Sequence, residues 1–288
     1  MSTPKAILTD TTRCTGCERC VRACKAYNGL GEDVPRRWKA RIDGLSSTRY
    51  TTLVRRPGNR FVRRQCRHCL EPACASACIV GALHKRADGP VVYDSTRCIG
   101  CRYCMMACPF EIPRYDWEKS VPYVRKCTFC QDRLAVGQQP ECTRACPEQA
   151  TIFGSRDELL EEAHRRVAQH PEKYVNKVFG ESEVGGTSVL YVSDIPLDFL
   201  NARANLADQP LPELTWAALS KVPPIVLGVS GVMAGVWWIT GRRMKLASEA
   251  LASESTADGR AGSTAASATS EAVDSATDQE PNDDEARS

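Results

Sequence analysis

The sequence predicts an α+β fold with a cysteine-rich head, residues 1–154, followed by a helix-and-strand extension, one apolar helix and a polar tail. Three observations support this prediction. All sixteen cysteines of the 288-residue chain lie between Cys14 and Cys146. Short apolar runs precede and follow the cysteine groups, as strands would. Late in the chain, residues 222–241 contain no charged side chain.

The cysteines fall into four groups of four. These groups are Cys14-Cys17-Cys20-Cys24, Cys66-Cys69-Cys74-Cys78, Cys98-Cys101-Cys104-Cys108 and Cys127-Cys130-Cys142-Cys146. Four thiolates hold one [4Fe–4S] cluster, so the count predicts four [4Fe–4S] clusters and a protein that transfers electrons. The first and third groups have the C-x2-C-x2-C-x3-C spacing of two-cluster ferredoxins, in which the fourth cysteine binds the neighbouring cluster. Gly16 and Gly100 in these groups let backbone N–H groups approach the cluster sulfides.

Two other uses of the cysteines fit less well. A disulfide framework belongs to secreted chains, and residues 1–12 contain no apolar signal core. A zinc ribbon uses C-x2-C pairs and has no need for a third cysteine in each run. We therefore expect iron–sulfur clusters.

An internal repeat underlies the four groups. Residues 10–14 recur with one change at 94–98, and the pattern Pro-x-Cys-x-x-Ala-Cys occurs at both 72–78 and 140–146. The order A-B-A′-B′ is an internal duplication of a two-motif unit. Linkers of 19 and 18 residues separate groups two, three and four. Both lengths suit ferredoxins, so spacing alone leaves open which groups pair.

Regular structure is expected between and after the motifs. Apolar runs at residues 6–8 and 91–93 predict strands before the first and third groups, and residues 150–153 predict a return strand. The extension, residues 155–220, opens with Ser155-Arg156-Asp157-Glu158, a capping box for a helix that ends before Pro171. A further strand is expected at 189–192.

Residues 222–241 are expected to form a single transmembrane helix. Twenty helical residues rise about 30 Å, the thickness of the hydrocarbon core of a bilayer. Trp237 and Trp238 lie where an interfacial aromatic belt would. Three basic residues, Arg242, Arg243 and Lys245, follow this segment, whereas only Lys221 precedes it. The positive-inside rule places the C-terminus in the cytoplasm and the head on the outer side of the cell membrane, with a cytoplasmic head as the alternative.

The tail, residues 246–288, is predicted to be disordered because it has almost no large apolar side chains. Its ten acids and two arginines give it a net charge of −8, against +3 for the chain, so the remainder carries +11. Each oxidised cluster with four thiolates carries about −2. Four clusters offset most of the excess, and no nucleic-acid partner is expected. No catalytic triad, phosphate-binding loop or nucleotide fingerprint is present, so we expect no catalytic centre in this chain.

The motifs resemble one family. The stretches CIGCRYCMMACPF, CTFCQDRLAVGQQPECTRACPEQATIFGSRDEL and GESEVGGTSVLYVSD, with the late apolar segment, are similar to the four-cluster, ferredoxin-type electron-transfer subunit of membrane-bound formate dehydrogenases and respiratory nickel–iron hydrogenases. The resemblance covers about residues 6–243 and leaves the tail out. One departure is Ile79, where relatives usually have proline.

The resemblance implies two interleaved ferredoxin-like lobes, each with two [4Fe–4S] clusters, and it implies the cluster ligands. The four ligand sets are Cys14, Cys17, Cys20 and Cys146; Cys24, Cys127, Cys130 and Cys142; Cys66, Cys69, Cys74 and Cys108; and Cys78, Cys98, Cys101 and Cys104. We refer to them as sets 1, 2, 3 and 4 in this order.

The resemblance also implies partners. A catalytic subunit with molybdenum or tungsten, or with nickel–iron, supplies electrons that pass to a multi-span membrane subunit that reduces quinone. The absence of an export leader favours the formate dehydrogenase type, exported with a partner that carries a twin-arginine signal. The alternatives are a hydrogenase subunit and a cytoplasm-facing ferredoxin subunit of another molybdopterin reductase. An iron–sulfur sensor is not expected, because no output domain is visible.

Overall fold

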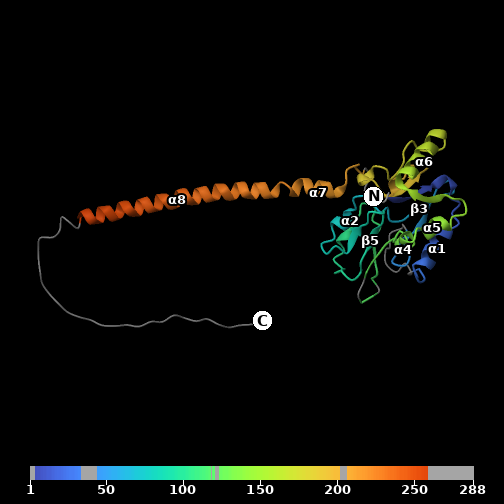
Figure 1. The fold of residues 1–288 in the computed structure, drawn as a ribbon, viewed down its shortest axis with the longest axis horizontal. Helices are drawn as coiled ribbons and strands as arrows, with labels where there is room; N and C mark the ends of the chain where they lie inside the picture. Colours follow the sequence, from blue (N-terminus) through green and yellow to red (C-terminus); the bar gives the residue numbers. More distant parts are fainter. Residues whose placement is uncertain (1–3, 34–43, 118, 121–122, 202–205, 259–288) are drawn as a thin grey trace. The chain divides into compact units, whose positions relative to one another are not determined.

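The computed structural model describes residues 4–33, 44–117, 119–120, 123–201 and 206–258. The chain divides into two compact units, Met1–Lys221 and Val222–Ser288, each described here by itself. The first unit holds all sixteen cysteines. The second holds the apolar segment, which Figure 1 draws as a long orange helix.

The first unit is made of short strands and short helices connected by loops. In chain order its elements are β1 (Lys5–Asp10), η1 (Thr11–Arg13), α1 (Arg19–Tyr27), β2 (Thr52–Arg56), β3 (Arg60–Arg64), α2 (Ala73–Ser76), β4 (Leu83–Lys85), β5 (Val91–Tyr93), α3 (Tyr103–Ala107), β6 (Arg114–Tyr115), β7 (Val124–Arg125), α4 (Gln131–Ala135), α5 (Glu141–Arg144), β8 (Thr151–Ser155), α6 (Arg156–Gln169), η2 (Glu183–Gly185), β9 (Val189–Val192), η3 (Asp198–Leu200) and α7 (Leu211–Leu219). This mixed content confirms the α+β prediction.

A three-stranded sheet with the order β8-β1-β9 forms the centre of the first unit. Strand β1 pairs with β8 antiparallel and with β9 parallel, so that Ile7 lies between Phe153 and Val189. The two faces of β1 are both buried. Ala6 and Leu8 pack against helix α6, whereas Ile7 packs on the opposite face with the residues around the cysteine loops.

The strands expected before the first and third cysteine groups are present. Strand β5 spans residues 91–93 as predicted, and it pairs antiparallel with β4, which follows the second group. The return strand after the fourth group is β8, one residue later than predicted, and its partner is β1. The strand before the first group therefore pairs with the strand after the fourth group.

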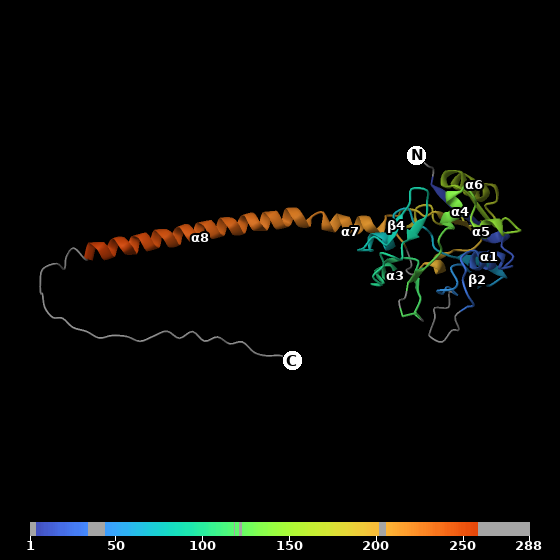
Figure 2. The same cartoon turned by 60° about the horizontal axis from the view of Figure 1, so that its bottom comes forward.

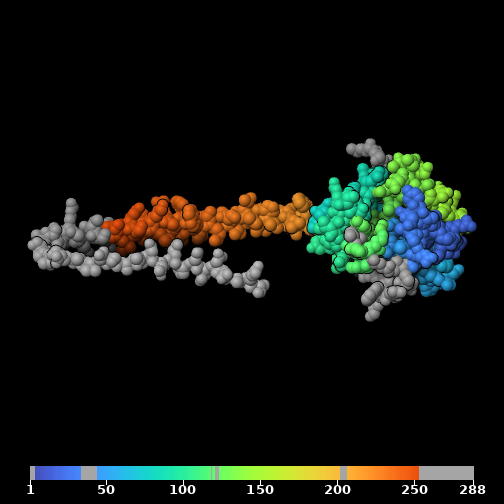
Figure 3. Space-filling view, turned by 90° about the horizontal axis from the view of Figure 1, so that it is seen from below, coloured from blue at the N-terminus to red at the C-terminus, as the bar shows by residue number. Residues whose placement is uncertain are grey.

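Two groups of elements pack separately within the first unit. Helix α1 packs against α5, and helix α2 packs against α3 and β4. In Figures 1 and 2, α1, α4 and α5 lie close together, while α2, α3, β4 and β5 lie in another region of the unit. Figure 3 shows the blue N-terminal residues beside the yellow-green residues that follow the fourth cysteine group. Segments far apart in the sequence thus form one body.

Helix α6 begins and ends as the sequence predicts. The Ser155 hydroxyl accepts a hydrogen bond from the backbone N–H of Glu158, and the Glu158 carboxylate accepts one from the N–H of Ser155. This reciprocal pair is the expected capping box. The helix ends at Gln169, two residues before Pro171.

The second unit contains one helix, α8 (Val222–Asp258), in its described part. The expected boundary of the tail at Leu246 is wrong for residues 246–258, which continue the helix. Alanine, leucine and glutamate are strong helix formers, and no glycine or proline occurs between residues 242 and 258 to end the helix. The remainder of the predicted disordered tail, 259–288, lies outside the described residues. One stretch, Leu211–Ala252, is long and apolar enough to cross a membrane, and an 18-residue window within it has a mean hydropathy of 1.7.

Candidate iron–sulfur site

The thiols of sets 1 and 2 each line one cavity. Cys14, Cys17, Cys20 and Cys146 line the first cavity together with Arg63. Cys24, Cys127, Cys130 and Cys142 line the second, next to Phe129 and Pro140. Each cavity thus combines thiols from the first and fourth cysteine groups. A cavity bordered by four thiols fits a [4Fe–4S] cube, in which each thiolate binds a different iron.

The electrostatics of set 1 and set 2 agree with this grouping. Burial, opposed by the charge of Arg63 and helped by the charges of neighbouring thiols, raises the pKa of the Cys20 thiol to about 11. The neighbouring thiols are Cys142, Cys14 and Cys146. Burial raises the pKa of Cys24 to about 12, with added repulsion from Cys142 and Cys130. Cluster insertion must therefore release protons from these thiols, because only thiolates bind iron.

Sets 3 and 4 gather thiols from the second and third cysteine groups. Burial raises the pKa of Cys74 to about 12, and the neighbouring charges that add to it are led by Cys66 and Cys108. Burial is also the main cause that raises the pKa of Cys69 well above its usual range. The charges of the other three set 3 thiols, Cys108, Cys66 and Cys74, are the next causes.

In set 4, burial raises the pKa of Cys104 to about 11. The next largest causes of this rise are the charges of the other set 4 thiols, Cys78, Cys98 and Cys101. Within the described part of the chain, no three Cys, His, Asp or Glu side chains gather closely enough to share one metal ion.

The cluster loops of the two A motifs have the same backbone. Gly16 and Gly100 have φ values of 75° and 74°, and the residues two positions later, Glu18 and Arg102, also lie in the left-handed region. A Cβ on Gly16 would approach the Phe61 ring to 2.7 Å. The glycines therefore serve both the left-handed turn and the close approach of a covering side chain.

A second repeated turn follows the last cysteine of three groups. The third residue after each of these cysteines has a positive φ and donates its N–H to the cysteine carbonyl: Gly81 to Cys78, Glu111 to Cys108 and Gln149 to Cys146. The turn after Cys78 forms with Ile79 in place of the usual proline. This departure from the family pattern leaves the local fold intact.

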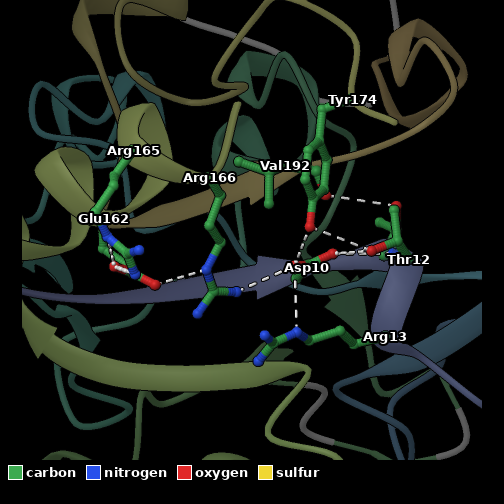
Figure 4. Close-up of polar contacts among 9 residues, drawn as sticks. Asp10, Thr12, Arg13, Glu162, Arg165, Arg166, Tyr174 and Val192 are labelled. Atoms are coloured by element: carbon green, nitrogen blue, oxygen red, sulfur yellow. Dashed lines mark hydrogen bonds and ion pairs between the residues drawn. The ribbon is translucent and has the colours of Figure 1, made fainter. Parts of the chain in front are cut away.

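The buried carboxylate of Asp10 supports the loop that carries Cys14 (Figure 4). Its Oδ1 accepts hydrogen bonds from the backbone N–H and the hydroxyl of Thr12, at 3.0 and 2.7 Å. Its Oδ2 accepts from the Tyr174 hydroxyl at 2.9 Å and from Arg166 Nη1 at 3.1 Å. The network ties the end of β1 to helix α6 and to the residues that follow it.

The repeated position in the third motif is Asp94. It accepts the same two hydrogen bonds from Thr96, at 2.9 Å to the N–H and 2.6 Å to the hydroxyl, but in an exposed setting. The local turn is thus encoded twice, and burial beneath a helix is added only in the first copy.

Three buried or half-buried cations near the thiols were missed in the sequence analysis. Arg63 is 1% exposed and Lys126 is 6% exposed. Lys126 Nζ donates to the carbonyls of Val91 and Cys127. Lys85, half-buried, donates to the carbonyls of His68 and Gly89, and burial lowers its pKa to about 8. The sequence signal was a basic residue close to the first cysteine of a group: Arg63 lies three positions before Cys66, and Lys126 directly precedes Cys127.

His68 is fully buried next to Phe129, which lines the set 2 cavity, and it precedes Cys69 of set 3 in the chain. Its Nδ1 accepts a hydrogen bond from the Val91 N–H at 2.9 Å, and its ring centroid lies 4.7 Å from that of Phe129. Burial, followed by the charges of Lys126 and Lys85, holds its pKa well below the usual range. The imidazole is therefore neutral and carries its proton on Nε2.

Sixteen thiols on loops of repeated ferredoxin spacing, with thiols of two different groups lining shared cavities, define an electron-transfer protein of the iron–sulfur class. Comparison with known families agrees: residues 59–156 match the model of a 4Fe-4S dicluster domain.

Three relatives extend the match beyond this domain. Hydrogenase-2 operon protein HybA of Escherichia coli O157:H7 is 33% identical in an alignment of 235 positions that covers 68% of this chain and 71% of the relative. The iron–sulfur subunit of nitrate-inducible formate dehydrogenase from E. coli K12 is 37% identical in an alignment of 244 positions that covers 78% of this chain and 75% of the relative. The B subunit of anaerobic dimethyl sulfoxide reductase from Haemophilus influenzae is 40% identical in an alignment of 159 positions that covers 52% of this chain and 73% of the relative. The 288-residue chain therefore belongs to this family of ferredoxin-type iron–sulfur electron-transfer subunits.

Proposed function

We propose that this chain is an electron relay of four [4Fe–4S] clusters held by ligand sets 1 to 4. The observation that carries the proposal is the gathering of thiols from two different motifs in each set. Sets 1 and 2 join the first and fourth cysteine groups, whose flanking strands β1 and β8 pair. Sets 3 and 4 join the second and third groups, whose flanking strands β4 and β5 pair. In the proposed fold, sets 1 and 2 belong to one lobe, and sets 3 and 4 belong to the other.

The charge effects between sets support a linear order. The charge of Cys20 in set 1 raises the pKa of Cys24 in set 2. The charge of Cys66 in set 3 raises the pKa of Cys127 in set 2, and the charge of Cys104 in set 4 raises that of Cys74 in set 3. The proposed path therefore runs through sets 1, 2, 3 and 4, with sets 1 and 4 at its ends. Cys17 and Cys101, which belong to the two end sets, are exposed.

The proposed complex has a catalytic subunit at one end of the relay and a membrane subunit at the other. We favour the formate dehydrogenase type, in which the catalytic subunit holds molybdenum or tungsten and a multi-span subunit reduces quinone. The formate dehydrogenase relative aligns over more of this chain than HybA does. The alternatives are a hydrogenase with a nickel–iron subunit and a reductase of the dimethyl sulfoxide type. Helix α8 would anchor the subunit, with the head on the outer side.

The cluster count and pairing can be tested on the purified complex. We expect on the order of sixteen irons and sixteen sulfides from this chain, four per cluster. Cys146→Ser is expected to alter the same cluster signal in electron paramagnetic resonance (EPR) spectra as Cys14→Ser, and Cys108→Ser the same signal as Cys66→Ser. If Cys146→Ser instead altered the signal that Cys127→Ser alters, the proposed sets would be wrong.

The type of complex is decided by the catalytic partner. Formate-dependent reduction of a viologen dye by the co-purified complex, with molybdenum or tungsten in the preparation, is expected. Hydrogen-dependent reduction with nickel in the preparation would instead favour the hydrogenase alternative. In either case all four clusters should become reduced when the electron donor is added.

A further inference from the structure

Arg63 is a buried cation placed between two of the proposed clusters. It lies in strand β3 and is 1% exposed. Its guanidinium donates from Nη2 to the Sγ of Cys142, a set 2 thiol, at 3.1 Å. The same side chain lines the cavity formed by the thiols of set 1. One side chain thus contacts the ligands of one cluster and borders the site of the next.

The other partners of Arg63 are neutral and hold it in place. Its Nε donates to the Gln65 side-chain oxygen at 3.0 Å, and Nη1 donates to the Thr151 hydroxyl at 3.2 Å. Tyr191 donates its hydroxyl to the Arg63 carbonyl at 2.9 Å. The guanidinium is therefore held by Gln65, which follows β3, and by Thr151 of β8, while Tyr191 of β9 fixes the Arg63 backbone.

The charge of Arg63 lacks a carboxylate partner among the ion pairs found in the described residues. A buried charge is costly unless an opposite charge lies close to it. The nearest negative groups are thiolates: burial alone lowers the pKa of the guanidinium, while the charges of Cys142 and Cys20 raise it by more, to a net rise above its usual range. The cluster thiolates are thus the counter-charge of Arg63.

We propose that Arg63 is a positioning residue that sets the reduction potential of the set 2 cluster and, more weakly, of the set 1 cluster. This inference rests on the proposed ligand sets. Reduction adds one electron and no proton, so the cluster becomes one unit more negative. A fixed positive charge in a poorly solvated site stabilises the reduced form more than the oxidised form. The N–H···S hydrogen bond acts in the same direction, since hydrogen bonds to sulfur tune cluster potentials.

The first test is a redox titration of the purified complex, monitored by EPR. In Arg63→Gln, the equilibrium constant for reduction of the set 2 cluster is expected to fall at least tenfold, which is 59 mV for one electron. A smaller fall is expected for set 1, and none for set 4. Arg63→Lys, which keeps the charge, should shift the set 2 potential less than Arg63→Gln does. The set 2 signal is assigned with Cys142→Ser.

Arg60→Gln is the matched control. Arg60 lies in the same strand, but its side chain is 40% exposed and pairs with Asp194. Its removal should leave all four potentials unchanged. The proposal is overturned if Arg63→Gln retains wild-type iron content with unchanged potentials, or if all four clusters shift equally. Equal shifts in Arg63→Lys and Arg63→Gln would also overturn it.

A second measurement takes its main result from the wild-type complex. With ¹⁵N-labelled arginine in the wild-type complex, pulsed EPR of the reduced set 2 cluster should show coupling to a nitrogen of Arg63. Arg63→Lys in the same labelled background should remove that coupling. Absence of coupling in the wild type would overturn the proposal. A preparation with far fewer irons would contradict the four-cluster function itself, so the two failures are distinguishable.

Discussion

Gly180 and Gly137 share a left-handed backbone but differ in their surroundings. Gly180 has φ of 91°, and an added Cβ would lie 2.5 Å from the Thr187 hydroxyl and 2.7 Å from the Val189 carbonyl oxygen. Gly137 has φ of 73° with no atom within 4 Å of an added Cβ. Substitution of Gly137 by alanine would therefore introduce backbone strain alone, whereas substitution of Gly180 would add a steric clash.

We expect Gly180→Ala to destabilise the head more than Gly137→Ala. Both variants carry left-handed strain of about 1–2 kcal/mol. Only Gly180→Ala also forces apart the backbone next to β9, because one of the atoms in the way is a carbonyl oxygen that cannot rotate aside. Thermal unfolding of the purified complex, followed under anaerobic conditions, measures the difference. Equal losses in the two variants would show that the backbone beside Gly180 yields freely.

Among single residues, the cysteine ligands could be predicted from the sequence, whereas the buried cations could not. Cysteine spacing has a direct chemical cause, because each thiolate must reach its own iron. The burial of Arg63 and Lys126 has no local cause of that kind. Both residues are buried because strands and loops from distant parts of the chain fold over them. From the sequence alone, a basic side chain is expected at the surface.

At the scale of elements, helix α6 covers one face of the central sheet. Its apolar side, Leu159, Ala163 and Val167, packs on Ala6 and Leu8 of β1. Because β1 continues into the first cysteine loop, the helix helps to hold that loop in place. The capping box at Ser155 is the local signal that starts this helix at the end of β8.

Ser155→Ala is expected to weaken the first turn of α6 by about 1 kcal/mol, since the backbone N–H of Glu158 loses its acceptor. Hydrogen–deuterium exchange should speed up across the first turns of α6 and change little in α1. Ser95→Ala is the control, because Ser95 lies in an exposed turn with no side-chain hydrogen bond found in the described structure. Comparable exchange in the two variants would argue against the capping role.

The positions of four strands and of helix α6 were predicted, whereas the hairpin of β2 and β3 and the partners of the strands were not. Strands β1, β5 and β9 stand out as short apolar runs between turn residues, which is a local property. The pairing of β1 with both β8 and β9 joins residues more than 140 positions apart. No local pattern encodes that contact, and spacing alone left the pairing of cysteine groups open. The helix beyond residue 245 was missed because polar composition was given more weight than helix propensity.

At the scale of the whole molecule, α8 and its flanking charges predict the orientation of the chain in the membrane. Arg242, Arg243 and Lys245 follow the apolar segment, against Lys221 before it. Retention of these charges in the cytoplasm favours an outward head. The acidic residues farther along count little in this bias.

A reporter fused after Ser288 tests this orientation in cells that also make the partner subunits. We expect a fluorescent protein at this position to be bright and alkaline phosphatase to be inactive. Replacing Arg242, Arg243 and Lys245 by glutamine should weaken the preference, whereas Lys221→Gln should not. An active phosphatase on the native chain would reverse the proposed sidedness.

The amino-acid sequence by itself determined the chemistry of this protein: sixteen cysteines at cluster spacing, their duplication, and one apolar segment of membrane length. These features are local, because ligand spacing and helix length are properties of short stretches. Only the tertiary structure decided which strands pair, which thiols share a cavity, and that Arg63 lies buried against Cys142. Those contacts form when distant segments pack together and exclude water. Burial also raises the pKa of the thiols and strengthens the attraction between Arg63 and the thiolates.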